Sequence, residues 1–239
     1  MCEGVSNQVN FLIDEASSTG KGANATISYL HYFFSHHGLG ESNAHLHAGN
    51  CVGQNKNNYF LWYFAWRIMN ELHASIIYSF LIAGHTKFGP DRSFGMIKKA
   101  YKVTYVSSLY EFASMVETSS NLGVNKAQRV RTHDGKIIVP VYDWASFLGR
   151  YFNKIPHIKK FHHFRFVKDN PGMVYFKEFV TSPEQSFMLL KDPAVRPPLS
   201  VLPPTINPDG LTEERKRYLF REIRQFCKPG TEDIVAPEP

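Results

Sequence analysis

The sequence has few cysteines, no long apolar run and no secretory leader, and each of these absences excludes a class of protein. Cys2, Cys51 and Cys227 are odd in number and far apart, so they indicate neither a disulfide framework nor a cysteine-based zinc site. No apolar run reaches about 18 residues without a charge, so we expect no membrane span. The N-terminus lacks a basic segment followed by an apolar stretch, so we expect no secretory signal. An intracellular, reducing location is the default expectation.

The chain also lacks a phosphate loop and lacks carboxylates in its first polar loop. Residues 20–24 contain two glycines and a lysine without the Gly-x-x-x-x-Gly-Lys-Ser/Thr spacing, so a nucleotide-binding P-loop is rejected. The first polar loop, residues 47–57, has Gly49 where a metal-dependent site would place a carboxylate. Its amides and Lys56 are suited to a sugar-phosphate backbone, but amides do not replace carboxylates as Mg²⁺ ligands. The alternative is an Asn-rich turn that caps the next helix.

The sequence has ample material for a core, since 43% of its 239 residues are hydrophobic and 14% are aromatic. Short apolar runs typical of strands alternate with helical patterns, in the order 9–13, 24–36, 44–48, 58–73, 75–82 and 90–101. This alternation predicts an α/β sheet. The aromatic segment 58–73 is apolar nearly all round, which predicts a buried helix.

Beyond residue 102 the pattern changes to one helix, two hairpins and a capped closing helix. The hairpin signals are His-Asp-Gly at 133–135 and Asp-Asn-Pro-Gly at 169–172. Asp143 and Thr212 are predicted helix caps. We expect a core at 1–105, a basic α+β extension at 106–192, a proline-rich linker at 193–210, a helix at 211–228 and a loose tail at 229–239.

A second polar loop, residues 84–92, carries the candidate chemistry. Both loops follow predicted strands, so they are expected at one edge of the sheet. Asp91 is the best single catalytic candidate, because a carboxylate there can hold a divalent metal. The alternative is that the carboxylate only stabilises the first turn of a helix through the helix dipole. His85 is suited to binding phosphate, transferring a proton or ligating a metal, or to a purely structural hydrogen bond. Lys87 and Arg92 are candidate phosphate contacts.

The net charge of +6 is unevenly distributed. Residues 126–165 contain nine basic residues and only two acidic ones, Asp134 and Asp143, so this segment alone carries +7. A basic block attracts phosphate backbones; the alternative is a solvated face without a ligand. The expected nucleic-acid contacts in this segment are Arg129, Arg131, Lys159 and Lys160.

Several strings of the sequence together resemble an uncharacterised eukaryotic domain family. They are residues 9–16, 21–25, 51–58, 84–88, 90–92 and 94–95, and the closing helix at 211–227 is similar as well. Two loop motifs, Asn-Cys-x-Gly-Gln-Asn-Lys-Asn and Gly-His-Thr-Lys-Phe-x-Pro-Asp-Arg, are fairly specific to that family. The family recurs in many near-copies in animal genomes, in the manner of transposon-derived genes.

The resemblance implies an RNase H-like fold with DDE-transposase character, a mixed sheet flanked by helices with a C-terminal α+β extension. It implies three acidic residues, one on a first strand, one before the Asn-Cys loop and one at Asp91. This chain has Gly49 where the family typically has an aspartate before the Asn-Cys pair, and the first strand of the family would lie upstream of Met1. We therefore expect an N-terminally truncated domain with two of its three carboxylates missing.

The sequence thus favours a catalytically inactive, transposon-derived domain that binds DNA or RNA without sequence specificity in the nucleus. One alternative is an active nuclease or transposase that uses Asp91 and His85 with Mg²⁺ or Mn²⁺. Another is a protein-interaction module or a decayed gene product. Truncation also predicts self-association, because the strand at 44–48 would expose an open edge.

Overall fold

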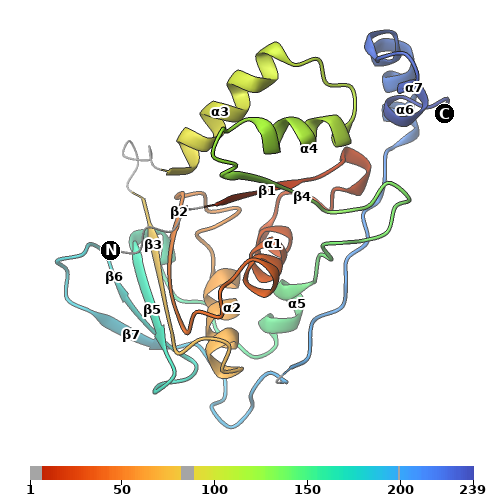
Figure 1. Cartoon of the computed structure of the whole chain (residues 1–239). Helices are drawn as coiled ribbons and strands as arrows, with labels where there is room; N and C mark the ends of the chain where they lie inside the picture. The colour runs from red at the N-terminus through yellow and green to blue at the C-terminus, as the bar shows by residue number, and fades with distance from the viewer. Residues whose placement is uncertain (1–6, 82–88, 199) are drawn as a thin grey trace. The chain divides into compact units, whose positions relative to one another are not determined.

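The computed structural model describes residues 7–81, 89–198 and 200–239 and shows a mixed α/β protein (Figure 1). The chain divides into two compact units, each assembled from separate stretches. Residues 20–86 and 140–207 form the large unit, and residues 1–19, 87–139 and 208–239 form the small unit. The predicted α/β class with a mixed sheet is confirmed. The units are discontinuous in sequence, whereas the domains expected from the sequence were contiguous.

The large unit contains a five-stranded mixed sheet in the order β2-β3-β5-β6-β7. Strands β2 and β3 are parallel, and the remaining pairs are antiparallel. The elements are α1 (Ala23–His36), β2 (Asn43–Ala48), α2 (Asn58–Met69), β3 (Ser75–Phe80), α5 (Trp144–Gly149), η2 (Ile158–Lys160), β5 (His163–Val167), β6 (Met173–Lys177) and β7 (Gln185–Met188).

Helix α2 is the centre of the large unit because it has no polar face. Every residue from Phe60 to Met69 is buried, including Arg67. The helix packs against β3, β5 and β6, and α1 and α5 pack against the helix in turn. Alternate side chains of the strands, such as Tyr78 and Phe166, complete the core. The predicted buried helix is confirmed, but it ends at Met69, before the expected residue 73.

Strand β2 lies at one edge of this sheet and pairs only with β3 in the part of the chain that the structure describes. The second predicted hairpin is confirmed as β5 and β6, and it extends the sheet on the other side of β3. No later hairpin therefore fills the open edge of β2 among the described residues.

The small unit contains a two-stranded parallel sheet formed by β1 (Gln8–Leu12) and β4 (Asn125–Arg129). Its helical elements are η1 (Glu15–Ser17), α3 (Gly89–Val103), α4 (Leu109–Thr118), α6 (Glu213–Tyr218), η3 (Leu219–Ile223), η4 (Arg224–Phe226) and α7 (Glu232–Val235). The first predicted hairpin is reduced to a single bridge between Arg131 and Ile137. The tail expected to be loose carries α7, which Arg224 holds through Asp233 at 2.7 Å.

Candidate nucleic-acid interface

Asp91, the catalytic and metal-binding candidate, lies in the first turn of α3 and is exposed. Arg92 beside it is exposed as well and lines a cavity with Ser93. His85 and Lys87 fall within residues 82–88, outside the described part of the chain. Among the described residues, no group of three or more His, Cys, Asp or Glu side chains is placed to hold a metal ion.

Lys56, expected from the sequence to contact phosphate, is buried and 1% exposed. Its Nζ donates a hydrogen bond to the carbonyl oxygen of Lys159 at 2.8 Å and lies 5.3 Å from the centre of the Phe80 ring. Burial lowers the pKa of Lys56. Its amino group connects the first polar loop to η2, so Lys56 cannot reach a phosphate in this conformation.

Arg129, the last residue of β4, is the best-defined basic side chain of the predicted interface. Its place is set by the parallel pairing of β4 with β1, in which Arg129 lies beside Leu12. The guanidinium stacks over the Tyr110 ring, with Cζ 4.1 Å from the ring centre. Its Nη1 is buried, and no residue within the described ranges gives it a hydrogen-bond partner. A buried N–H without an acceptor is costly, so a movement of the Arg129 side chain that brings this group to an acceptor is favourable.

Arg131 and His133 follow Arg129 in the turn after β4. The Nη1 of Arg131 donates to the carbonyl oxygen of Gly135 at 3.4 Å, and the His133 ring meets Tyr110 edge-on at 5.3 Å. One cavity of about 720 Å³ in the small unit is lined by Tyr110, Arg129, Arg131 and His133. The sequence did not predict a role for Tyr110 or His133. No sequence pattern indicates that a tyrosine in the first turn of α4 stacks against an arginine 19 residues later.

The acidic residues of this cavity already have partners. Glu15 binds Arg215 at 2.9 Å and Asp233 binds Arg224 at 2.7 Å. The carboxylate of Asp14 accepts the backbone N–H of Ala16 at 2.8 Å. Within the described ranges, neither Arg129 nor Arg131 forms an ion pair with a carboxylate. The cavity therefore presents two arginines whose charges are not neutralised.

Lys159 and Lys160, the other pair of the predicted interface, lie on η2 of the large unit and are exposed. They line a cavity of about 760 Å³ with Phe161. Lys160 Nζ lies 3.6 Å from the Glu178 carboxylate, and this exposed ion pair contributes little to folding stability. The basic segment 126–165 thus spans both units, with Arg129 and Arg131 in the small unit and the two lysines in the large one.

Comparison with known proteins identifies a family for this chain. The profile of one family, described as a domain of unknown function (DUF7869), matches residues 3–182, which is most of the chain. The chain belongs to this family. The DUF7869 match includes the first polar loop, Asp91 and every basic residue of the predicted interface. No curated protein and no solved structure matches the chain significantly. None of the helices that the structure describes has the length and hydropathy needed to cross a bilayer.

Proposed function

We propose that this DUF7869 chain is a transposase-derived, RNase H-like domain that binds DNA or RNA through phosphate contacts and does not cleave it. The observation that carries the proposal is the pair of unneutralised arginines, Arg129 and Arg131, in a cavity whose carboxylates are already bound. A guanidinium matches the geometry of a phosphate and donates two parallel hydrogen bonds to it. Such contacts fix a nucleic-acid backbone without reading its sequence.

The strand arrangement supports the RNase H-like part of the proposal. In an RNase H-like sheet the third and fourth strands do not pair directly, because the first two strands lie between them. Here β1 and β2 belong to different sheets, and the outer edge of β2 is unpaired among the described residues. In this proposal, the parallel pair β2 and β3, joined by α2, takes the place of the fourth and fifth strands of that fold.

A missing acidic metal ligand supports the proposal that the domain is catalytically inactive. Two-metal transfer requires shared acidic ligands that hold both ions in place. Of the acidic set that the resemblance implies, Asp91 is present, whereas position 49 is glycine. The competing hypothesis is a nuclease that combines Asp91 with His85 and Mg²⁺ or Mn²⁺. Cleavage by the purified protein that is lost in Asp91→Ala would favour that hypothesis.

A nuclear location and self-association follow from the same proposal. In this proposal the domain binds its nucleic acid in the nucleus, where unpaired cysteines stay reduced. The described cysteines, Cys51 and Cys227, are both free. The unpaired edge of β2 offers backbone N–H and C=O groups to a second chain. Light scattering that shows a strict monomer, with slow hydrogen exchange throughout β2, would argue against self-association.

Fluorescence anisotropy with labelled single-stranded and double-stranded oligonucleotides tests the binding proposal. We expect Arg129→Ala together with Arg131→Ala to weaken binding of every oligonucleotide to a similar extent. The matched control is Lys98→Ala together with Lys99→Ala, which removes two exposed charges from α3 of the same unit. Equal affinities of the two double variants would remove the arginines from the interface. Failure of the wild-type protein to bind any oligonucleotide would instead favour an interaction module or a decayed gene product.

A further inference from the structure

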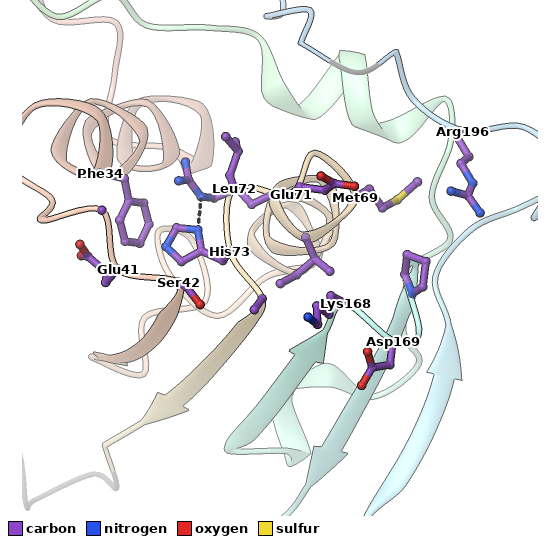
Figure 2. Close-up of a pocket in the computed structure, with 15 residues that line it drawn as sticks. Phe34, Glu41, Ser42, Met69, Glu71, Leu72, His73, Lys168, Asp169 and Arg196 are labelled. Carbon is purple, nitrogen blue, oxygen red and sulfur yellow. Dashed lines mark hydrogen bonds between the residues drawn. The ribbon is translucent and has the colours of Figure 1, made fainter.

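A further cavity, of about 660 Å³, lies in the large unit at the amino ends of the parallel strands (Figure 2). Ser42 and Ala74, which line it, directly precede β2 and β3. The first polar loop follows β2 and therefore lies at the other end of the strands, where their carboxyl ends are. None of the residues of the predicted nucleic-acid interface lines this cavity, so it needs an explanation of its own.

The wall of this cavity contains a buried cation without an anion. Arg67, on α2, is 5% exposed, and no carboxylate lies within 4.0 Å of its nitrogens among the described residues. Its guanidinium stacks on the Phe34 ring at 4.4 Å, and Nη1 donates to the Tyr63 hydroxyl at 3.0 Å. Burying a charge costs several kcal/mol unless it is paired. A phenol and an aromatic ring offset only part of that cost.

Glu41, one of the acidic residues that line the cavity, is occupied elsewhere. The carboxylate of Glu41 accepts the backbone N–H of Leu39 at 2.6 Å and is held against its own loop. It influences Arg67 and His73 only through space. The charge of Arg67 is therefore not cancelled by a direct contact.

His73 adds a donor to the same wall. It is 4% exposed and its Nδ1 accepts a hydrogen bond from Arg67 Nε at 3.2 Å, which is the dashed line in Figure 2. Burial, and then the charge of Arg67, lower the pKa of His73 to about 4. The neutral ring must therefore carry its proton on Nε2, and this buried nitrogen has no hydrogen-bond partner in the part of the chain that the structure describes.

We propose that this cavity binds a small polar molecule through an oxyanion, a carboxylate or a phosphate, held by Arg67 and His73. Arg67 supplies a cation without an ion-pair partner among the described residues, His73 supplies a donor, and an oxyanion offers acceptors and negative charge together. The volume lies within the range of about 300–1,000 Å³ typical of small-molecule sites, so there is room for more than the anionic group. Lys168, Asp169 and Arg196 lie on the side away from His73 and would contact the remainder of the ligand (Figure 2).

Calorimetric titration of the full chain with inorganic phosphate and with acetate, against chloride at equal ionic strength, tests this proposal. We expect wild-type protein to bind at least one of the two oxyanions, and the preferred one identifies the ligand group. Arg67→Lys keeps the charge but loses the planar fork, and should weaken binding at least ~10-fold, the loss of one charge-assisted hydrogen bond. Lys154→Ala, an exposed control in the same unit, should bind as wild type does.

A second measurement needs no variant and covers the case in which Arg67→Lys does not fold. In wild-type protein, the backbone amide resonances of His73 and Ala74 should shift as the oxyanion is added. Chloride at equal ionic strength should leave them unchanged. The proposal is overturned if neither phosphate nor acetate binds wild-type protein more tightly than chloride. It is also overturned if a folded Arg67→Lys binds as well as the Lys154→Ala control.

Discussion

Ser28 gives the sharpest stability test of the large unit, because one buried hydroxyl serves two donors from the distant segment 140–207. It lies on α1 and is 1% exposed. Its Oγ accepts the backbone N–H of Tyr142 at 2.9 Å and the indole N–H of Trp144 at 3.2 Å. The same hydroxyl donates to the carbonyl oxygen of Asn24 at 2.7 Å. Ser28→Ala removes all three bonds and adds no bulk.

The expected cost comes mainly from the two N–H groups left without an acceptor. Each buried unsatisfied donor costs about 1–3 kcal/mol. The bond to Asn24 matters less, because that carbonyl still accepts its helical N–H. Alanine recovers a few tenths of a kcal/mol through helix propensity. Because Tyr142 is only partly buried, we expect the free energy of unfolding to fall by roughly 2–4 kcal/mol.

Tryptophan fluorescence during urea unfolding is the assay for this change. Trp62, Trp66 and Trp144 are the three tryptophans of the chain, all lie in the large unit and none is more than 3% exposed, so the signal reports on that unit. Ser35→Ala is the matched control, because Ser35 makes the same backward hydrogen bond on α1 but is exposed. If Ser28→Ala costs no more than Ser35→Ala, the buried hydroxyl does not join the two segments.

Three further predictions follow from single positions. Gly172→Ala should destabilise the large unit by about 1–3 kcal/mol more than Gly40→Ala, because both glycines have positive φ but only Gly172 would place a Cβ 2.6 Å from Leu190; urea unfolding checks this. The lowered pKa of His73, about 4 against an ordinary 6.5, should make the large unit lose stability as pH falls from about 6.5 to about 4, and unfolding midpoints independent of pH over that window would contradict it. Neither wild-type protein nor Gly49→Asp should hydrolyse DNA or RNA with Mg²⁺ or Mn²⁺ in a gel assay, although the added side chain meets nothing within 4 Å.

The elements of the large unit were predictable from the sequence because their signals are local. The apolar runs that form β2, α2 and β3 have the length and periodicity of buried elements, and the structure places each within a few residues of the expected range. The caps at Asp143 and Thr212 were predictable for the same reason, since each side chain accepts an N–H three residues later.

The pairings between distant segments were not predictable. Strand β4 has the polar sequence Asn-Lys-Ala-Gln-Arg, which does not indicate that it pairs in parallel with β1, more than 100 residues earlier. Lys56 is surrounded by asparagines, which indicates an exposed loop, but its partner is a carbonyl oxygen 103 residues later. Arg67 lies within an apolar helix, and only the structure shows that it lines a cavity. Tertiary contacts decide these cases, and they leave no periodic trace in the sequence.

The salt dependence of oligonucleotide binding tests the proposed phosphate contacts of Arg129 and Arg131 most directly. Each phosphate contact to double-stranded DNA releases counterions and contributes about −0.9 to the slope of log K against log salt. We predict a steep slope for wild-type protein and a slope shallower by about 1–2 for the Arg129→Ala, Arg131→Ala variant, with Lys98→Ala, Lys99→Ala close to wild type. A wild-type affinity independent of salt, or an unchanged slope in the arginine variant, would contradict the account.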